Sequence, residues 1–140
     1  MSKRNLLIAV FMGGLLLTGP TAEAENVSLV AHLLGGNNVP ANKSDAFGEG
    51  QFTYDTASRT LDYYVTFDGI APGKIDIHGP AGASESGALV ANFPVSESPV
   101  TGKVTLTPDQ GAALLAGRIY VDIHSQAFAN GEIRGQIGKQ

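Results

Sequence analysis

The tripeptide D-I-H occurs twice, at residues 76–78 and 122–124, each time inside an alternating run, K-I-D-I-H at 74–78 and Y-V-D-I-H at 120–124. Alternation of apolar and polar residues is typical of a β-strand with one buried face. Asp and His then share the other face. If the two strands are neighbours, two acids and two imidazoles meet in one patch, because opposed side chains lie about 5 Å apart at Cβ. The pattern predicts a β fold and places the candidate site.

The first 24 residues have the organisation of a secretory signal peptide. Lys3 and Arg4 precede an apolar run at 6–17, and A-E-A at 22–24 fits a cleavage site. The apolar run is shorter than the roughly 20 residues that span a bilayer. We therefore expect a signal peptide at 1–24, a β domain at 25–140, no membrane span after cleavage, and a periplasmic or secreted protein.

Charge and cysteine content exclude several classes of function. The net charge is −4 at pH 7, and no basic cluster is present, which argues against a nucleic-acid partner. The chain has no cysteine. Disulfides, thiol catalysis and cysteine-ligated metal centres are therefore impossible, and stability must come from packing.

The rest of the chain consists of short runs separated by Gly, Pro and Asn turn signals. T-P-D-Q at 107–110 has the residues of a capping box with proline in the first turn, and predicts a short helix over 108–116 that ends at Gly117. About eight strands, one short helix and no βαβ alternation predict an antiparallel β-sandwich or a Greek-key barrel. The expected strands lie at 26–34, 48–54, 60–67, 74–78, 88–93, 100–106, 118–124 and 132–137.

One interpretation of the D-I-H pair is a metal site. His78 and His124 with Asp76 or Asp122 would supply three or four nitrogen and oxygen ligands, which suit Zn(II) or Cu(II). Residues two apart on one strand are separated by about 6.7 Å. The Asp and His of one tripeptide would therefore have to lean toward each other to share an ion.

A second interpretation is structural. Asp76 and Asp122 could hold the histidines by hydrogen bonds, and Glu132 with Arg134, which alternate on one face of the last strand, could form a charge network that fixes strand register. A network of this kind stabilises a fold only when each buried member has a partner.

An enzyme is the third interpretation, and the sequence argues against it. The segment G-A-S-E-S at 82–86 lacks the final glycine of a nucleophile elbow. His124 and Ser125 are adjacent on a strand and point to opposite faces. The two metals of a copper–zinc superoxide dismutase need more than the three histidines present. We expect no enzymatic activity and no cofactor, apart from the Zn or Cu of the metal hypothesis.

Four segments together resemble the CHRD domain, a module named after chordin and also found in small exported bacterial proteins. The resemblance covers nearly all of the chain after residue 24, and the C-terminal segment is its most specific part. The segments are L-G-G-N-N-V-P at 34–40, G-x-x-P-G-K-I-D-I-H-G-P-A-G at 69–82, I-Y-V-D-I-H-S at 119–125 and N-G-E-I-R-G-Q at 130–136.

The resemblance implies an exported all-β domain with a binding or structural role, because chordin is a secreted protein that binds growth factors and the bacterial members have no established activity. The partner would be an extracytoplasmic protein, a glycan or a metal ion. Many members have H-I-H where this chain has D-I-H at 76–78. Asp76 keeps an atom able to bind metal, but a carboxylate favours harder ions than imidazole does.

Overall fold

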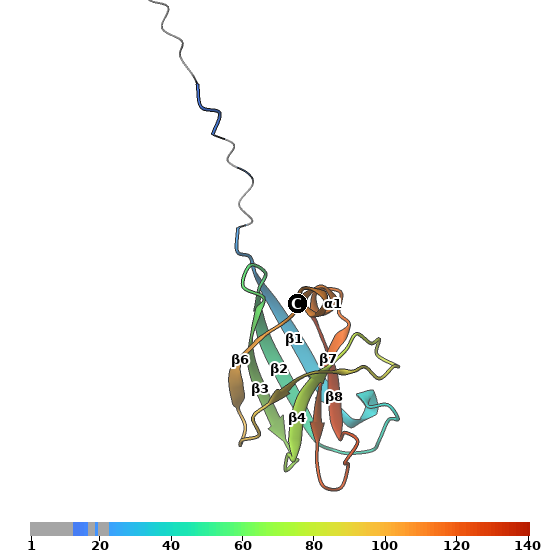
Figure 1. The fold of residues 1–140 in the computed structure, drawn as a ribbon. Coiled ribbons are helices and arrows are strands. Elements are labelled where there is room, and N and C mark those ends of the chain that lie inside the picture. The colour runs from blue at the N-terminus through green and yellow to red at the C-terminus, as the bar shows by residue number, and fades with distance from the viewer. Residues whose placement is uncertain (1–12, 17–18, 20–22) are drawn as a thin grey trace, which may run out of the picture.

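The computed structural model describes residues 13–16, 19 and 23–140 (Figure 1). Most of the predicted signal peptide lies outside these residues. The β domain begins at Asn26, directly after the predicted cleavage site. Its elements are β1 (Asn26–Leu34), η1 (Gly35–Asn37), β2 (Phe47–Asp55), β3 (Thr60–Asp68), β4 (Lys74–His78), β5 (Leu89–Phe93), β6 (Val100–Thr105), α1 (Pro108–Leu115), β7 (Ile119–His124) and β8 (Ile133–Lys139).

The eight strands form one antiparallel sheet in the order β5-β4-β7-β8-β1-β2-β3-β6. The sheet curls into a nearly closed barrel, in which the end strands β5 and β6 approach each other (Figure 1). The predicted all-β fold is confirmed, and of its two predicted forms the structure adopts the barrel.

The β2–β3 hairpin shows how alternation fixes register. Tyr54 lies opposite Leu61, and both side chains are buried in the barrel. The turn is closed by Asp55, whose Oδ1 accepts hydrogen bonds from the amides of Ala57 and Ser58 at 2.8 and 3.0 Å. A slip by one residue would turn every buried side chain of a strand to the solvent.

Helix α1 covers one end of the barrel (Figure 1). Thr107 accepts a hydrogen bond from the Gln110 amide, and the Gln110 side chain accepts one from the Thr107 amide, as the capping box predicts. Gly117 follows the helix with φ 72°. Such a short helix is marginal alone, so Leu114, which is fully buried among core residues, holds it on the barrel.

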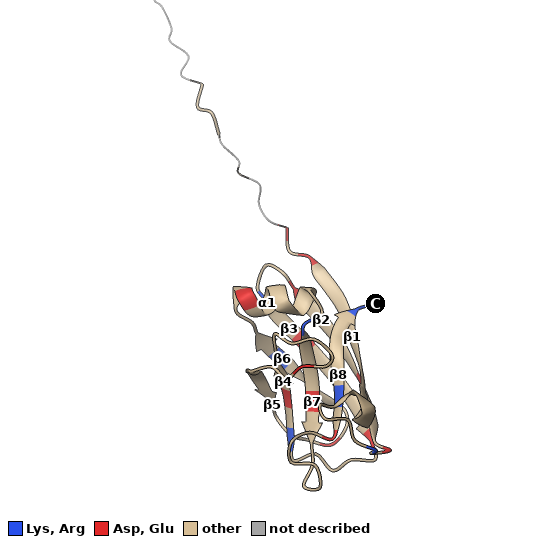
Figure 2. Cartoon of the chain, turned by 90° about the vertical axis from the view of Figure 1, so that its right-hand side faces the viewer, with Lys and Arg blue, Asp and Glu red and all other residues tan. Residues whose placement is uncertain are grey.

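Strands β4 and β7 turn their aliphatic residues inward. Ile75, Ile77, Val121 and Ile123 are all buried in the core cluster. Their alternating partners therefore lie on the outer surface of the barrel wall, where Figure 2 shows acidic positions in β4 and β7 beside a basic position in β8. This outer face carries the candidate site.

Candidate metal centre

The two D-I-H strands are direct neighbours. β4 and β7 pair antiparallel, with Asp76 opposite Asp122 and with Lys74 opposite His124. His78 lies opposite Tyr120 at the other end of the pair. The two acids therefore form the centre of the patch, and the two histidines flank it from opposite directions.

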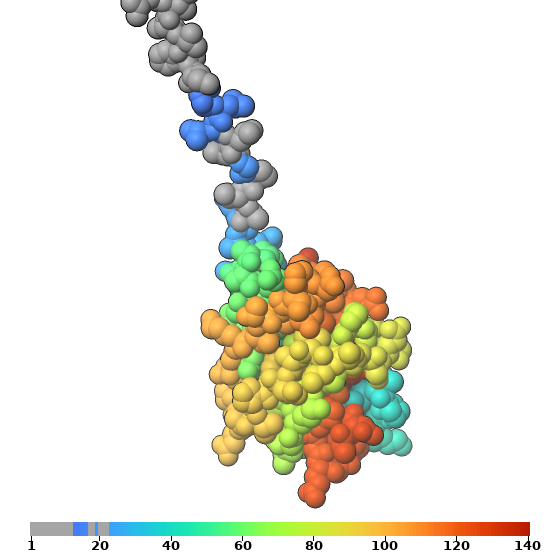
Figure 3. All heavy atoms as spheres, viewed as in Figure 1, coloured from blue at the N-terminus to red at the C-terminus, as the bar shows by residue number. Residues whose placement is uncertain are grey.

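Loops cover this outer face, so the cluster is not a surface patch. Residues 79–88 follow β4 and residues 125–132 follow β7, and both loops form part of the molecular surface in Figure 3. The Asp76 side chain is 0% exposed, and those of His78 and His124 are 16% and 13% exposed. Charged groups this deeply buried require partners.

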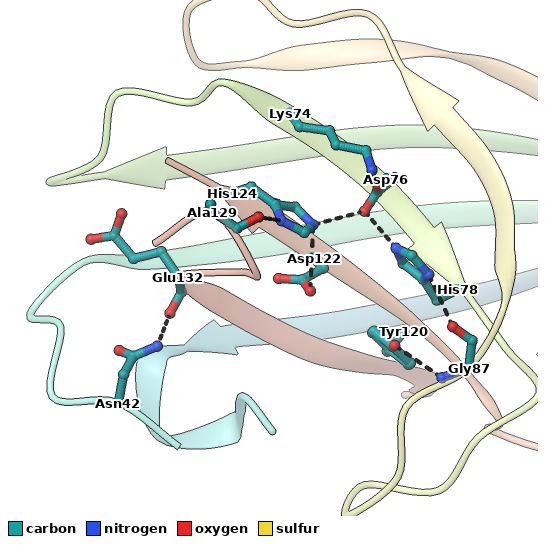
Figure 4. A network of polar contacts seen from close by, with 10 residues as sticks. All are labelled: Asn42, Lys74, Asp76, His78, Gly87, Tyr120, Asp122, His124, Ala129 and Glu132. Atoms are coloured by element: carbon teal, nitrogen blue, oxygen red, sulfur yellow. Dashed lines mark hydrogen bonds and ion pairs between the residues drawn. The ribbon is translucent and has the colours of Figure 1, made fainter. Parts of the chain in front are cut away.

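Asp76 is the hub of the cluster (Figure 4). Its Oδ1 lies 2.8 Å from His78 Nε2 and 3.3 Å from His124 Nε2, and its Oδ2 lies 3.0 Å from Lys74 Nζ. His124 Nε2 also lies 3.6 Å from Asp122 Oδ2. The side chains of Asp76 and His78 lean toward each other across the backbone spacing, which is what the sharing of one ion by a single tripeptide would require.

The two histidines are oriented in the same way. Nδ1 of His78 donates to the Gly87 carbonyl at 3.1 Å, and Nδ1 of His124 donates to the Ala129 carbonyl at 2.9 Å. A carbonyl oxygen only accepts, so Nδ1 carries the proton in both rings. Both Nε2 atoms then face the carboxylates. Backbone carbonyls hold metal-binding histidines in this manner, leaving the other nitrogen to bind the ion.

The cluster shifts the acidity of its members. The hydrogen bond with Asp76 raises the pKa of His78 above 6.5, against the opposing effect of burial. Burial would raise the pKa of Asp76, but the hydrogen bond with His78 and the contact with the Lys74 ammonium outweigh it, and the pKa falls below 3.8. Burial and the charge of Asp76 raise the pKa of Asp122 to about 6, although the nearby His124 opposes the shift. Of the two carboxylates, Asp122 is therefore the one whose negative charge is less well stabilised by the groups around it.

Unpartnered polar atoms concentrate at this cluster. Among the residues that the structure describes, four buried side-chain N or O atoms lack a hydrogen-bond partner: Asn38 Nδ2, Asp76 Oδ2, Asp122 Oδ1 and His124 Nε2. The contact of Asp76 Oδ2 with Lys74 is an ion pair that lacks the angle of a hydrogen bond. Asn38 approaches Asp122 at Gly131, where an added Cβ would lie 2.7 Å from oxygens of both.

The donor atoms have spacings that suit a metal ion. In a tetrahedral site with bonds of about 2.0–2.1 Å, ligand atoms are about 3.3 Å apart. The distance from Asp76 Oδ1 to His124 Nε2 is 3.3 Å. The ligand atoms of Asp76, His78 and His124 all lie within 4.8 Å of one another. Asp122 lies outside that set of three and would join it by a side-chain rotation.

Glu132 and Arg134 have separate partners. Glu132 accepts a 2.6 Å hydrogen bond from Ser44 Oγ. The guanidinium of Arg134 lies 3.5 Å from the centroid of the Tyr120 ring. Within residues 23–140 the two form no ion pair with each other: Glu132 contacts the loop before β2 through Ser44, and Arg134 contacts the loop after β4 through the Gly82 carbonyl.

Some members of the site were missed in the sequence. Lys74 shares the outward face of the K-I-D-I-H run, so alternation alone could have included it. The carbonyls of Gly87 and Ala129 could not be found this way, because a loop's backbone direction leaves no residue pattern. The third histidine, His32, is exposed on β1 and lies 3.7 Å from Glu49, outside the cluster.

Hydropathy gives no membrane-crossing helix anywhere in the described part of the chain. No significant match was found among curated proteins or among solved structures. The family model of the CHRD domain matches residues 29–137, which include all four segments of the resemblance. This match supports a non-enzymatic binding or structural module in general. The chain belongs to the CHRD domain family.

Proposed function

We propose that this protein is an exported CHRD-type binding module whose ligand is a divalent transition-metal ion, Zn(II) or Cu(II). His78 Nε2, His124 Nε2 and Asp76 Oδ1 are the proposed ligands, and Asp122 is the proposed fourth. The observation that carries the proposal is that the ligand atoms of Asp76, His78 and His124 lie within 4.8 Å of one another in a buried cluster, where Asp76, Asp122 and His124 each have a buried polar atom without a hydrogen-bond partner. Native proteins leave few such atoms, and a cluster of them calls for a bound ion or water.

The donor set supports these ions. Imidazole nitrogen suits zinc and copper, and two carboxylates balance the charge of a divalent ion in a buried site. Binding would displace the proton from His78 Nε2 and relieve the repulsion between Asp76 and Asp122. A site with four protein ligands has no open position for a substrate. The proposed role is therefore metal holding or metal-dependent stabilisation, not catalysis.

Thermal unfolding with and without zinc tests the proposal. A ligand that binds only the folded state at 100 times its Kd stabilises by about 2.7 kcal/mol. For a domain of this size the midpoint should rise by roughly 10 °C. Copper is tested in the same way.

The matched variants are His124→Ala and His32→Ala. His124→Ala should abolish the rise, because it removes one of the three proposed ligands. His32→Ala should keep the rise, because His32 lies outside the cluster. If neither metal raises the midpoint of the native sequence, or if His124→Ala responds as the native sequence does, the cluster is only a hydrogen-bonded network that joins β4 to β7.

Export is a separate part of the proposal. The first strand begins two residues after the predicted cleavage site, so removal of residues 1–24 would leave the barrel intact. Cell fractionation followed by intact mass measurement should find the protein outside the cytoplasm, beginning at Glu25. A cytoplasmic protein that retains residues 1–24 would contradict export and leave the metal proposal standing.

A further inference from the structure

A groove beside the metal cluster has a buried arginine in its floor. Its volume is about 550 Å³, within the range of small-ligand sites. Arg134 and Gln136 of β8 form the floor, residues 36–41 form one wall, and Ala83 with Ser84 form the other. Figure 3 shows the two walls, yellow-green and cyan, close together at one edge of the molecule.

The guanidinium of Arg134 is held in a fixed position. Nη2 donates to the Gly82 carbonyl and to Gln136 Oε1, both at 3.0 Å. Gln136 is itself fixed, because its Nε2 donates to the carbonyls of Ala81 and Gly117. The guanidinium carbon stacks on the Tyr120 ring. A guanidinium restrained on three sides loses little side-chain freedom when a ligand binds.

The charge of Arg134 has no ionic partner. The residue is 2% exposed, and in the described part of the chain it forms no ion pair. Its hydrogen bonds all use Nη2, so Nε and Nη1 have no acceptor among residues 23–140. Burial lowers the pKa of Arg134, and the charge of its cross-strand neighbour Asp122 offsets this shift only in part. A buried, unpaired charge is expensive, and an anionic ligand would offset that penalty.

We propose that this groove binds a carboxylate group through Arg134, with residues 36–41 and 83–84 enclosing the small aliphatic part of the ligand. One negative charge matches one guanidinium, whereas a dianionic phosphate would leave excess negative charge beside Asp122. Asn38, which is buried with an unpartnered Nδ2, adds a second donor at the wall. Val39, Pro40 and Ala83 supply apolar contact for a short side chain.

The ligand chemistry favours a peptide C-terminus or a small organic acid over a sugar acid. Sugar rings are commonly bound against an exposed aromatic face, and no aromatic residue lines this groove except His32 at its edge. The inference is independent of the metal proposal, because none of the four proposed metal ligands lines the groove.

NMR titration of the metal-free protein tests the inference. The probes are acetyl-alanyl-alanine, the same peptide with a C-terminal amide, and propionate. The acid peptide should shift the Nε–H resonance of Arg134 and the side-chain amide of Asn38, and the amide peptide should not. Tighter binding of the peptide than of propionate identifies a peptide C-terminus, and equal binding identifies a small acid. Equal shifts with acid and amide, or no shift with any probe, would overturn the inference.

Two variants locate the site. Arg134→Met should weaken binding of the acid peptide at least tenfold, in line with a charge-assisted hydrogen bond of about 1.5–3 kcal/mol. Arg118→Met is the matched control, because Arg118 is exposed and pairs with Glu85 outside the groove. Ala83→Trp fills the groove from an exposed loop and leaves Arg134 in place, so it should block binding even if Arg134→Met fails to fold. Full binding by Ala83→Trp would overturn the inference.

Discussion

Asp76 and Asp122 face each other across β4 and β7 with both carboxylates buried, and His124 Nε2 lies between them, 3.3 Å from one and 3.6 Å from the other. Two like charges in this position repel strongly. Burial and this repulsion raise the pKa of Asp122 to about 6, so Asp122 loses its proton at a higher pH than an exposed aspartate does. A cation at this point would allow both to ionise.

Asp122→Asn should stabilise the metal-free protein above pH 6. The folded-state pKa of Asp122 is raised above its unfolded value of 3.8. Its contribution is therefore favourable below pH 4 and is lost as the pH rises to about 6. Asparagine keeps the shape without the charge, and the gain in the free energy of unfolding at pH 7 should be about 3 kcal/mol. Urea unfolding at pH 4 and pH 7 measures it. The control is Asp45→Asn, at an exposed position, which should leave the free energy of unfolding unchanged at both pH values. A lower free energy of unfolding for Asp122→Asn than for the native sequence at pH 7 would refute the prediction.

His78 should titrate above pH 6.5 in the metal-free protein. Its pKa is raised chiefly by the hydrogen bond with Asp76, so its contribution to stability is complete below pH 6.5 and is lost as the pH rises through the folded-state pKa. The ring proton resonances of His78 report the midpoint directly. In Asp76→Asn the midpoint should fall, because burial remains while the carboxylate is gone. An unchanged midpoint would show that another group holds the proton.

Gly131→Ala should destabilise the protein, because the added methyl group would clash with the cluster at Asp122. Gly131 has φ 116°, and an added Cβ would lie 2.7 Å from oxygens of Asn38 and Asp122. Backbone strain and the clash should together lower the free energy of unfolding by about 1–3 kcal/mol. Gly138→Ala in the following strand, β8, is the control, because its Cβ would meet nothing within 4 Å. Equal unfolding midpoints for the two variants would contradict this geometry.

Leu114→Ala should detach α1 from the barrel. The side chain is fully buried and the helix is too short to persist alone. The free energy of unfolding should fall by about 2–4 kcal/mol. Thermal unfolding measures this fall, and amide exchange should become faster across Pro108–Leu115. Leu115→Ala removes a partly buried leucine from the same turn and should cost less. If Leu114→Ala and Leu115→Ala lower the free energy of unfolding equally, the packing of Leu114 is not what holds the helix on the barrel.

Strand positions followed from the sequence because alternation and turn residues act locally. The predicted strand at 26–34 and the helix start at Pro108 agree with the structure, as do the edges of β4 at residues 74 and 78. The pairing of the two D-I-H strands is only a hypothesis from the sequence, because nothing in the tripeptides specifies which strands pair.

The side-chain arrangement could not be predicted in the same way. Antiparallel register puts His78 and His124 four positions apart along the strands, roughly 13 Å at the backbone, and only the inward lean of both rings brings their Nε2 atoms within 4.8 Å. That lean depends on the Gly87 and Ala129 carbonyls, which belong to loops. The partners of Glu132 and Arg134 could not be predicted for a related reason, because Ser44 and Tyr120 belong to other segments of the chain.

Anomalous X-ray diffraction from crystals grown with zinc tests the central claim most directly. We expect one strong anomalous peak per chain, about 2.0–2.2 Å from His78 Nε2, His124 Nε2 and a carboxylate oxygen of Asp76, with Lys74 turned away from Asp76. A map in which zinc binds only elsewhere, while His78 and Asp76 keep their 2.8 Å hydrogen bond, would contradict the account.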